Sequence, residues 1–168
     1  MASGKNISIS EKDEKNEKIS AISKELNFLS LKPKIYAFNS DASKLADIKN
    51  FTKTHRERPV IYFSAKTGEG LDGLIKTCYE ALNLISFLTV GKIEARAWTI
   101  RKGAKAKEAA GVIHSDFEKN FIRAKIINWE ALISTKSFGD ASSKGLIRTE
   151  GKDYEIQDGD VVEFLIGK

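Results

Sequence analysis

Two short apolar runs, separated by a segment with helical periodicity, constrain the fold of this chain more than any other feature. The runs lie at residues 34–38 and 59–63, and each has the length of a strand. Between them, residues 42–54 carry large apolar side chains at intervals of three, which predicts a helix. A strand, a helix and a strand in about 30 residues form a βαβ unit, whose strands are parallel and are covered by helices.

Further helices are expected on both sides of this unit. The apolar positions from residue 17 recur at helical spacing and stop near the helix breaker Pro33. A second helix is predicted at residues 69–84, and it places five small or large apolar side chains on one face: Leu71, Leu74, Ile75, Cys78 and Leu82. In this setting we expect Cys78, the only cysteine, to be a buried small hydrophobic residue.

From residue 88 the pattern becomes typical of a β-rich domain. Strands are predicted at residues 95–100, 121–127, 154–156 and 161–166, and a helix at residues 105–113. Residues 134–151 are rich in Ser, Gly and Lys and are expected to be a loop, and residues 157–160 are expected to form a hairpin-type turn. The sequence therefore predicts two small domains that meet near residue 88.

The net charge of +5 is concentrated in one part of the chain. Residues 92–127 contain nine Lys or Arg against four Asp or Glu, and the remainder balances at 19 against 19. One basic segment on a neutral body is typical of a protein that binds a polyanion, although a solvated face gives the same composition. The longest apolar stretch is only about ten residues, and residues 1–18 contain no apolar signal core, so we expect a cytoplasmic protein without a membrane span.

Polar residues follow both apolar runs, at the point where each predicted strand ends. The residues are Asn39, Ser40 and Asp41 after the first run and Ser64, Ala65 and Lys66 after the second. Ligands bind beyond the carboxyl ends of parallel strands, so this placement favours a shared binding site. The alternative is turn chemistry alone, because Asn, Asp and Ser favour turns.

Three glycines, Gly68, Gly70 and Gly73, match the dinucleotide-binding pattern G-x-G-x-x-G. Four residues separate the preceding strand from the first glycine, and Glu69 and Asp72 would place carboxylates beside a pyrophosphate. We therefore interpret the glycines as residues that shape the loop and cap the next helix.

Several stretches resemble the YchF/Obg-like ATPase family of P-loop NTPases. Two stretches resemble the TGS domain of this family, a small β-grasp module. They are LNLISFLTVGKIEARAWTIRKGAKAKEAAGVIHSDFEKNFIRAKI at residues 82–126 and DGD followed by VVEFLI at residues 158–166. FLSLKPKIYAFN at 28–39 and SAKTGEGLDGL at 64–74 resemble the last part of its P-loop domain. The resemblance implies an α/β plus α+β architecture in which a partial P-loop domain (βαβ parallel sheet) over residues 17–87 precedes a β-grasp TGS domain over 88–168. Residues 1–16 would be disordered or form the exit from a coiled-coil insertion.

The same resemblance implies that the two strand-end tripeptides recognise the base of ATP or GTP. An Asn amide offers both a donor and an acceptor, a carboxylate accepts ring N–H groups, and a Lys stem can cover the base. The acid stands at Asp41 and the fourth residue is Ala42, in place of the family patterns N-K-x-D or N-x-x-E, so the base preference stays open. The sequence contains no G-x-x-x-x-G-K-[ST], so catalytic residues are not expected in this chain, and hydrolysis and Mg²⁺ binding are expected only of an intact protein with a P-loop.

The expected partner is the ribosome, through rRNA or a ribosomal protein, and not DNA. Seven side chains of the TGS-like part are expected to neutralise phosphates on one surface: Arg101, Lys102, Lys105, Lys107, Lys119, Arg123 and Lys125. Self-association through an exposed sheet edge is also considered. The alternative function is a free-standing TGS module that binds RNA or protein without nucleotide chemistry.

Two residue types in the second domain invite functional roles that we do not assign. His114 has no Cys, His or acidic cluster with metal-ligand spacing around it, and a turn-organising or core histidine is favoured. Trp98 and Trp129 could stack on bases, but a tryptophan inside an alternating strand such as Trp98 is more often a core residue.

Overall fold

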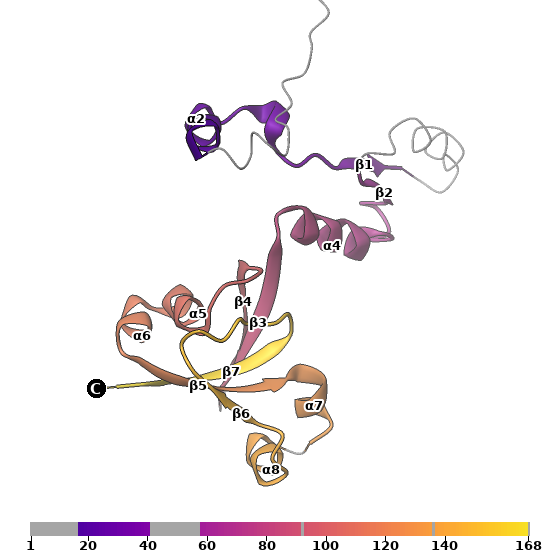
Figure 1. Cartoon of the computed structure of the whole chain (residues 1–168). Coiled ribbons are helices and arrows are strands. Elements are labelled where there is room, and N and C mark those ends of the chain that lie inside the picture. Colours follow the sequence, from indigo (N-terminus) through magenta and orange to yellow (C-terminus); the bar gives the residue numbers. More distant parts are fainter. Residues whose placement is uncertain (1–16, 41–57, 92, 136, 168) are drawn as a thin grey trace, which may run out of the picture. The chain divides into compact units, whose positions relative to one another are not determined.

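The chain consists of two compact units, Met1–Ala81 and Leu82–Lys168 (Figure 1). The computed structural model describes residues 17–40, 58–91, 93–135 and 137–167. The division lies a few residues before the boundary predicted near residue 88, because Leu84–Val90 forms one continuous strand that belongs to the second unit.

The first unit contains a small parallel sheet. Its described elements are α2 (Glu17–Leu26), the 3-10 helix η1 (Leu29–Leu31), β1 (Tyr36–Asn39), β2 (Val60–Phe63) and α4 (Leu71–Ala81). β1 pairs with β2 in parallel, from Tyr36 opposite Val60 to Asn39 opposite Phe63, which confirms the predicted pairing. The helix predicted at residues 42–54 lies outside the described residues.

α4 is shorter than the helix predicted at residues 69–84. It begins after Gly70 and ends before Asn83, whose positive φ of 55° turns the chain into the next strand. The predicted apolar face is only partly covered, since Ile75 is 56% exposed and Cys78 is half-buried. The expectation of a buried cysteine is therefore met only in part.

The second unit is built on a five-stranded mixed sheet in the order β4-β3-β7-β5-β6 (Figure 1). The strands are β3 (Leu84–Val90), β4 (Ala95–Arg101), β5 (Phe121–Asn128), β6 (Arg148–Glu150) and β7 (Asp160–Ile166). β3 and β7 run parallel at the centre of the sheet, and the other neighbouring strands are antiparallel. The first and last strands of the unit are thus direct neighbours.

The helices of this unit lie on both faces of the sheet. They are α5 (Ala106–Ile113), α6 (Ser115–Lys119), α7 (Trp129–Ile133) and α8 (Phe138–Ser143). Because strand side chains alternate between faces, Ala124 and Ile126 pack toward α5, whereas Ile127 points to the other face.

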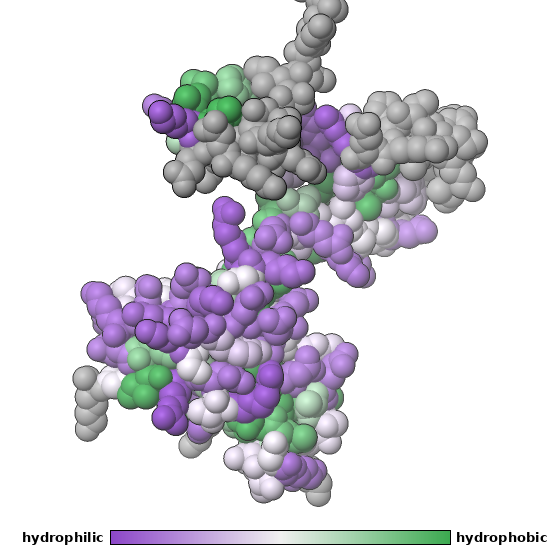
Figure 2. All heavy atoms as spheres, in the orientation of Figure 1, coloured by the Kyte–Doolittle hydropathy of each residue, from purple (hydrophilic) through white to green (hydrophobic). Residues whose placement is uncertain are grey.

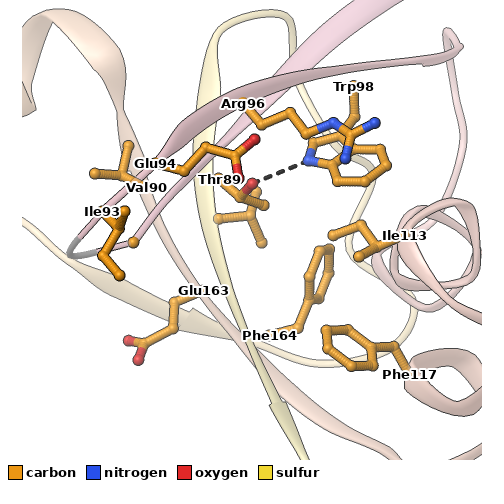
Figure 3. A pocket seen from close by; sticks show the side chains of 12 residues that line it. Thr89, Val90, Ile93, Glu94, Arg96, Trp98, Ile113, Phe117, Glu163 and Phe164 are labelled. Carbon is orange, nitrogen blue, oxygen red and sulfur yellow. Dashed lines mark hydrogen bonds between the residues drawn. The ribbon is translucent and has the colours of Figure 1, made fainter.

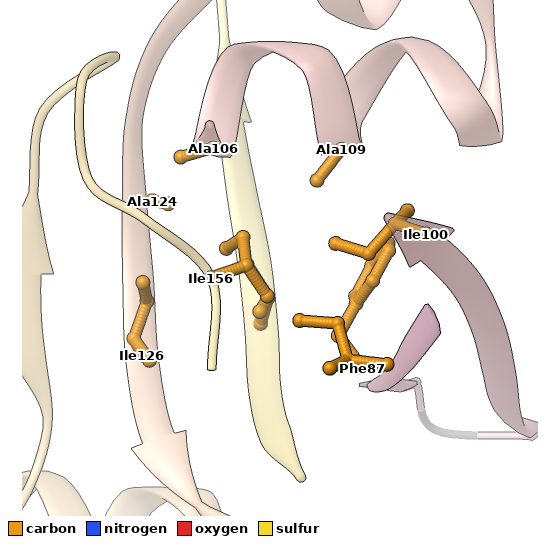
Figure 4. Close-up of a cluster of buried hydrophobic side chains, with 9 residues drawn as sticks. Phe87, Ile100, Ala106, Ala109, Ala124, Ile126 and Ile156 are labelled. Carbon is orange, nitrogen blue, oxygen red and sulfur yellow. The ribbon is translucent and has the colours of Figure 1, made fainter. Parts of the chain in front are cut away.

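The main core lies between α5 and the sheet (Figure 4). α5 contributes Ala106 and Ala109, both fully buried, and their small side chains let the helix approach the strands closely. The sheet and the loop between β6 and β7 contribute the larger buried side chains, namely Ile85, Phe87, Ile100, Ile126, Ile156 and Val162. A second, smaller core joins Ile127 and Val161 to residues of α7 and α8.

The structure of this unit differs from the predictions in four places. β3, which lies beside the central strand β7, was not predicted, and residues 134–151 contain α8 and β6 instead of a loop. Residues 154–156 form no strand and make a single bridge between Lys105 and Glu155. The turn at 157–160 exists, with a hydrogen bond from the Asp160 N–H to the Gln157 carbonyl at 3.1 Å, but it is not a hairpin, because β6 pairs with β5 and not with β7. Among the described helices, none is long and apolar enough to cross a lipid bilayer.

Candidate functional site

The two strand-end segments of the first unit are joined by a hydrogen bond. The backbone N–H of Ala65 donates to Oδ1 of Asn39 at 3.0 Å, and the N–H of Ser40 donates to the Phe63 carbonyl at 3.1 Å. The structure thus brings together the predicted residues after β1 and β2. Asp41 lies outside the described residues.

The loop that follows β2 is organised around Ser64. Its side chain is almost fully buried, and its Oγ accepts the N–H of Thr67 at 3.3 Å. Its backbone bonds to both sides of the loop, with the Ser64 N–H donating to Glu69 and the Gly68 N–H donating to Ser64, each at 2.8 Å. Ser64 therefore shapes the loop through both its side chain and its backbone.

Two glycines of this loop allow the backbone conformation that the loop requires, as the sequence indicated. Gly68 and Gly70 have positive φ of 81° and 76°, a region that glycine enters without steric cost. A Cβ at Gly70 would collide with the backbone of Tyr62, whereas a Cβ at Gly73 would meet nothing. The third glycine of a dinucleotide site is needed for close helix–strand packing, and Gly73 has no such role.

The hydrogen bonds already made decide which donors this loop can offer to a ligand. The N–H of Ala65 is taken by Asn39, so it is not available to the exocyclic group of a base. Within the described part of the chain, the Asn39 Nδ2 group and the Lys66 N–H make no hydrogen bond, and both residues are exposed. The strand ends thus carry an exposed amide donor, an exposed backbone donor and an aliphatic Lys stem.

Four of the seven cations predicted to bind phosphates lie together where the chain enters α5. Arg101 ends β4, Lys102 lies in the following turn, Lys105 precedes α5 and Lys107 is in its first turn. Figure 2 shows mostly hydrophilic residues over the part of the second unit that contains α5 and α6.

A fifth cation, Lys152, lies beside this group and was missed by the sequence reasoning. The Lys107 N–H donates to the Lys152 carbonyl at 3.4 Å, and the Ala106 N–H donates to Tyr154 at 2.8 Å. Only the tertiary pairing of residues 152–155 with the start of α5 reveals this neighbour, because no periodicity links two segments so distant in sequence.

The amino terminus of α5 is closed by these contacts. The Lys105 N–H donates to Oε2 of Glu108 at 2.9 Å, and the next two N–H groups bond to the carbonyls of Tyr154 and Lys152. The free N–H groups of a helix start can bind an anion, but here those of Ala106 and Lys107 already have acceptors. A phosphate at this end would therefore be met mainly by the Lys and Arg side chains.

The remaining three predicted cations lie elsewhere. Lys119 ends α6, and Arg123 and Lys125 lie on the face of β5 opposite Ala124, which packs beneath α5. Lys125 also pairs with Glu163 at 3.2 Å. The seven residues therefore do not form the single surface that the sequence predicted, because alternation along β5 directs two of them away from α5.

A pocket of about 490 Å³ opens in the second unit between the β3–β4 hairpin, β7 and the helices α5 and α6 (Figure 3). Trp98 forms one wall, and its indole N–H donates to Oγ1 of Thr89 at 2.9 Å. The guanidinium of Arg96 lies 4.2 Å from the Trp98 ring centroid. Trp98 is thus partly a core residue, as predicted, and partly a pocket wall.

His114 organises a turn, which agrees with the sequence interpretation. It caps α6, and its Nδ1 accepts the N–H of Asp116 at 3.2 Å. The residues that the structure describes hold no group of three or more His, Cys, Asp or Glu side chains that could bind a metal ion.

The Asp158-Gly159-Asp160 motif ties the turn to the sheet. The Ser86 N–H donates to the Asp158 carboxylate at 2.8 Å, while the buried Asp160 accepts the Gln157 N–H and the Tyr154 hydroxyl, each at 2.9 Å. Burial, and then the hydrogen bond and charge of Asp160, raise the pKa of Tyr154 above its ordinary value of 10.0. The two carboxylates of the motif thus hold the turn against β3 and against Tyr154.

Comparisons with known proteins identify the chain. Residues 84–167 match the family model YchF-GTPase_C, described as a protein of unknown function (DUF933). Among solved structures, the Schizosaccharomyces pombe YchF GTPase matches with a TM-score of 0.75 and 32% identity, over 89% of this chain and 47% of that chain. The mixed α/β fold is therefore that of the YchF-type nucleotide-binding proteins. The chain belongs to the YchF family.

Curated relatives named "Ribosome-binding ATPase YchF" agree with this assignment. The protein of Mycoplasma genitalium is 52% identical over 99 residues, which cover 59% of this chain and 27% of that protein. The protein of Buchnera aphidicola subsp. Schizaphis graminum is 38% identical over 181 aligned positions, which cover 92% of this chain and 49% of that protein. The chain spans about half the length, or less, of these relatives.

Proposed function

We propose that the chain is the carboxyl-terminal portion of a ribosome-associated, cytoplasmic ATP- or GTP-binding protein. In this proposal the first unit is the last part of a P-loop domain and carries base-recognition loops, and the second unit is a TGS domain that contacts the ribosome. Membership of the YchF family and the names of the relatives support the proposal. A mixed sheet crossed by one helix, α5, is the arrangement expected of a β-grasp module.

The observation that carries the nucleotide part is the hydrogen bond between Ala65 and Asn39. It holds the ends of β1 and β2 as one composite surface at the carboxyl edge of the parallel pair, where ligands of such sheets bind. The Asn39 Nδ2 group and the Lys66 N–H are donors, and they suit the acceptor nitrogens and oxygens of a purine edge. Phosphate binding and Mg²⁺ belong to a P-loop, whose pattern this sequence does not contain.

The base proposal is tested by titrating the ¹⁵N-labelled chain with adenosine and, separately, with guanosine. A purine base of about ten ring and exocyclic atoms, at roughly 0.3–0.4 kcal/mol per atom, binds with about 3–4 kcal/mol, which corresponds to a dissociation constant of about 1–6 mM. We expect chemical-shift changes at the Asn39 side-chain amide and at the Lys66 backbone amide, and we expect Asn39→Ala to abolish them. The nucleoside that binds with the lower dissociation constant identifies the preferred base. Unchanged spectra at saturating nucleoside would contradict the proposal and leave a binding module without nucleotide chemistry.

The ribosome proposal predicts an electrostatic contact by the cations at the start of α5. Binding of the chain to purified ribosomes should weaken steeply as salt rises, since Lys and Arg displace counterions from phosphates. The triple charge reversal Lys102→Glu, Lys105→Glu and Lys107→Glu should abolish co-sedimentation at moderate salt. The matched control reverses three exposed lysines of the first unit, Lys32, Lys34 and Lys76. The assignment of this surface would be contradicted if both triple variants lost ribosome binding equally, or if both kept it.

A further inference from the structure

The pocket beside the β3–β4 hairpin has an apolar interior that is held in place by aromatic packing. Ile113, Phe117 and Phe164 lie on one side of it, and Trp98 stands across from them (Figure 3). Phe164 contacts Phe87 and Phe121 edge to face, with ring centroids 6.0 and 6.1 Å apart. These contacts anchor the interior in the main core, so the pocket is a preformed feature.

The charged side chains around the pocket differ in the contacts that they make with other side chains. The guanidinium of Arg96 stacks on Trp98, and Glu163 pairs with Lys125. Glu94 also lines the pocket, and it makes no ion pair with any residue that the structure describes. Arg96 keeps its positive charge while it stacks on Trp98, so Glu94 is the charged side chain of the lining that has neither an ion pair nor a ring contact among the described residues.

The rim of the pocket leaves apolar surface uncovered. Ile93 is fully exposed at the tip of the hairpin, and Val90 is about half exposed beside it. β4, which contributes Arg96 and Trp98, is an edge strand that pairs only with β3 within the described sheet. A neighbouring polypeptide can thus approach along this side of the pocket and find both apolar contacts and backbone groups.

We propose that this pocket binds a segment of a partner protein that inserts an aromatic or aliphatic side chain between Trp98 and Phe117 and sets an adjacent Lys or Arg against Glu94. The volume of about 490 Å³ accommodates one large side chain with its flanking backbone. A polypeptide fits better than a nucleic acid, because the rim offers the exposed aliphatic side chains of Val90 and Ile93 and the backbone groups of the edge strand β4. The site uses none of the lysines assigned to ribosome binding, so each proposal can fail without the other.

The test starts from a phage-displayed library of random twelve-residue peptides, selected on the immobilised 168-residue chain. We expect the enriched peptides to share an aromatic or aliphatic residue next to Lys or Arg. The affinity of one such peptide, labelled with fluorescein, is then measured by fluorescence anisotropy. Glu94→Lys should weaken it by about threefold to tenfold, as reversal of a partly exposed ion pair does. Ile93→Asp should weaken it as well, and since both side chains are exposed, neither change threatens the fold.

The control is Asp153→Lys, which makes the same charge change at an exposed residue outside the pocket and should leave the affinity within twofold. Three outcomes would overturn the proposal: no peptide enriched above the empty support, equal peptide affinity for Glu94→Lys and Asp153→Lys, or displacement of the peptide by a single-stranded oligouridine whose own binding strengthens in Glu94→Lys. The last outcome would assign the pocket to RNA.

Discussion

Gly70 is the residue on which the strand-end loop of the first unit depends most directly. Its φ of 76° and the closeness of the Tyr62 backbone both exclude a side chain. We expect Gly70→Ala to destabilise the loop by roughly 1–3 kcal/mol, the cost of a strained backbone conformation. Hydrogen exchange of the Ser64 and Ala65 amides measures this loss.

The matched control for that substitution is Gly73→Ala in α4. A Cβ at Gly73 meets nothing, and alanine is the better helix former by about 1 kcal/mol, so this change should slow the same exchange or leave it unaltered. Faster exchange in Gly73→Ala than in Gly70→Ala would show that the loop is not held by the glycine conformation.

Tyr154 links the turn before β7 to the buried carboxylate of Asp160. Tyr154→Phe removes this hydrogen bond, and we expect it to lower the free energy of unfolding of the second unit by about 1–2 kcal/mol. Both tryptophans of the chain lie in this unit, so urea unfolding followed by Trp fluorescence reports it selectively.

The raised pKa of Tyr154 also predicts an alkaline dependence. The folded state holds the phenolic proton more tightly than the unfolded chain, because burial and Asp160 disfavour the phenolate. The contribution of the proton to stability is therefore complete below the ordinary pKa of 10.0 and is lost as pH rises through the raised value. Wild-type stability should fall above pH 10 more steeply than that of Tyr154→Phe, and parallel curves for the two proteins would contradict this account.

At the scale of elements, the contact between α5 and the sheet depends on alanine. Ala106 and Ala109 are fully buried against large side chains of the sheet. Ala109→Leu adds volume where none is free, and we expect it to cost about 1–3 kcal/mol in the urea unfolding of the second unit. Val112→Leu, at a position of the same helix that is 48% exposed, should change little. Equal effects of the two substitutions would show that the helix tilts to accept the larger side chain.

The elements that the sequence predicted well are those with a clear period. Strands rich in Leu, Val and Ile and the helix α5 show the hydrophobic periodicity of their own secondary structure. The parallel pairing of β1 with β2 followed from the spacing of two apolar runs. β3 escaped prediction because both of its faces are apolar: Ile85 and Phe87 meet the main core and Leu88 meets the smaller one, so no alternation marks it. β6 has only three residues, Arg148–Glu150, and it is a strand because β5 offers a partner, which local propensity does not record.

The candidate sites were predictable to different degrees. The residues at the ends of β1 and β2 could be placed together from topology, but the hydrogen bond that occupies the Ala65 N–H could not. Lys102, Lys105 and Lys107 are close in sequence and stay close in space, while Arg123 and Lys125 separate from them because strand alternation, not distance along the chain, sets their face. The pocket around Trp98 had no sequence signal, since its walls come from four separate segments.

At the scale of the whole molecule, the second unit has the components of an independent domain. It contains two hydrophobic cores and a closed set of strand pairings within residues 82–168. We expect a protein of residues 82–168 alone to give a dispersed ¹⁵N–¹H spectrum and a single cooperative urea transition. A collapsed spectrum would show that the fold of this unit depends on residues before Leu82.

The order in which the strands are made differs from the order in which they lie. β7 is synthesised after the other four strands of this unit, yet it occupies the centre of the sheet between β3 and β5. While the polypeptide is still growing, the unit can form only two separate hairpin-like halves, β3 with β4 and β5 with β6, with the apolar sides of both open to water. A chain that stops before Asp160 would therefore leave two unjoined halves exposed to chaperones and proteases, and no partially working domain.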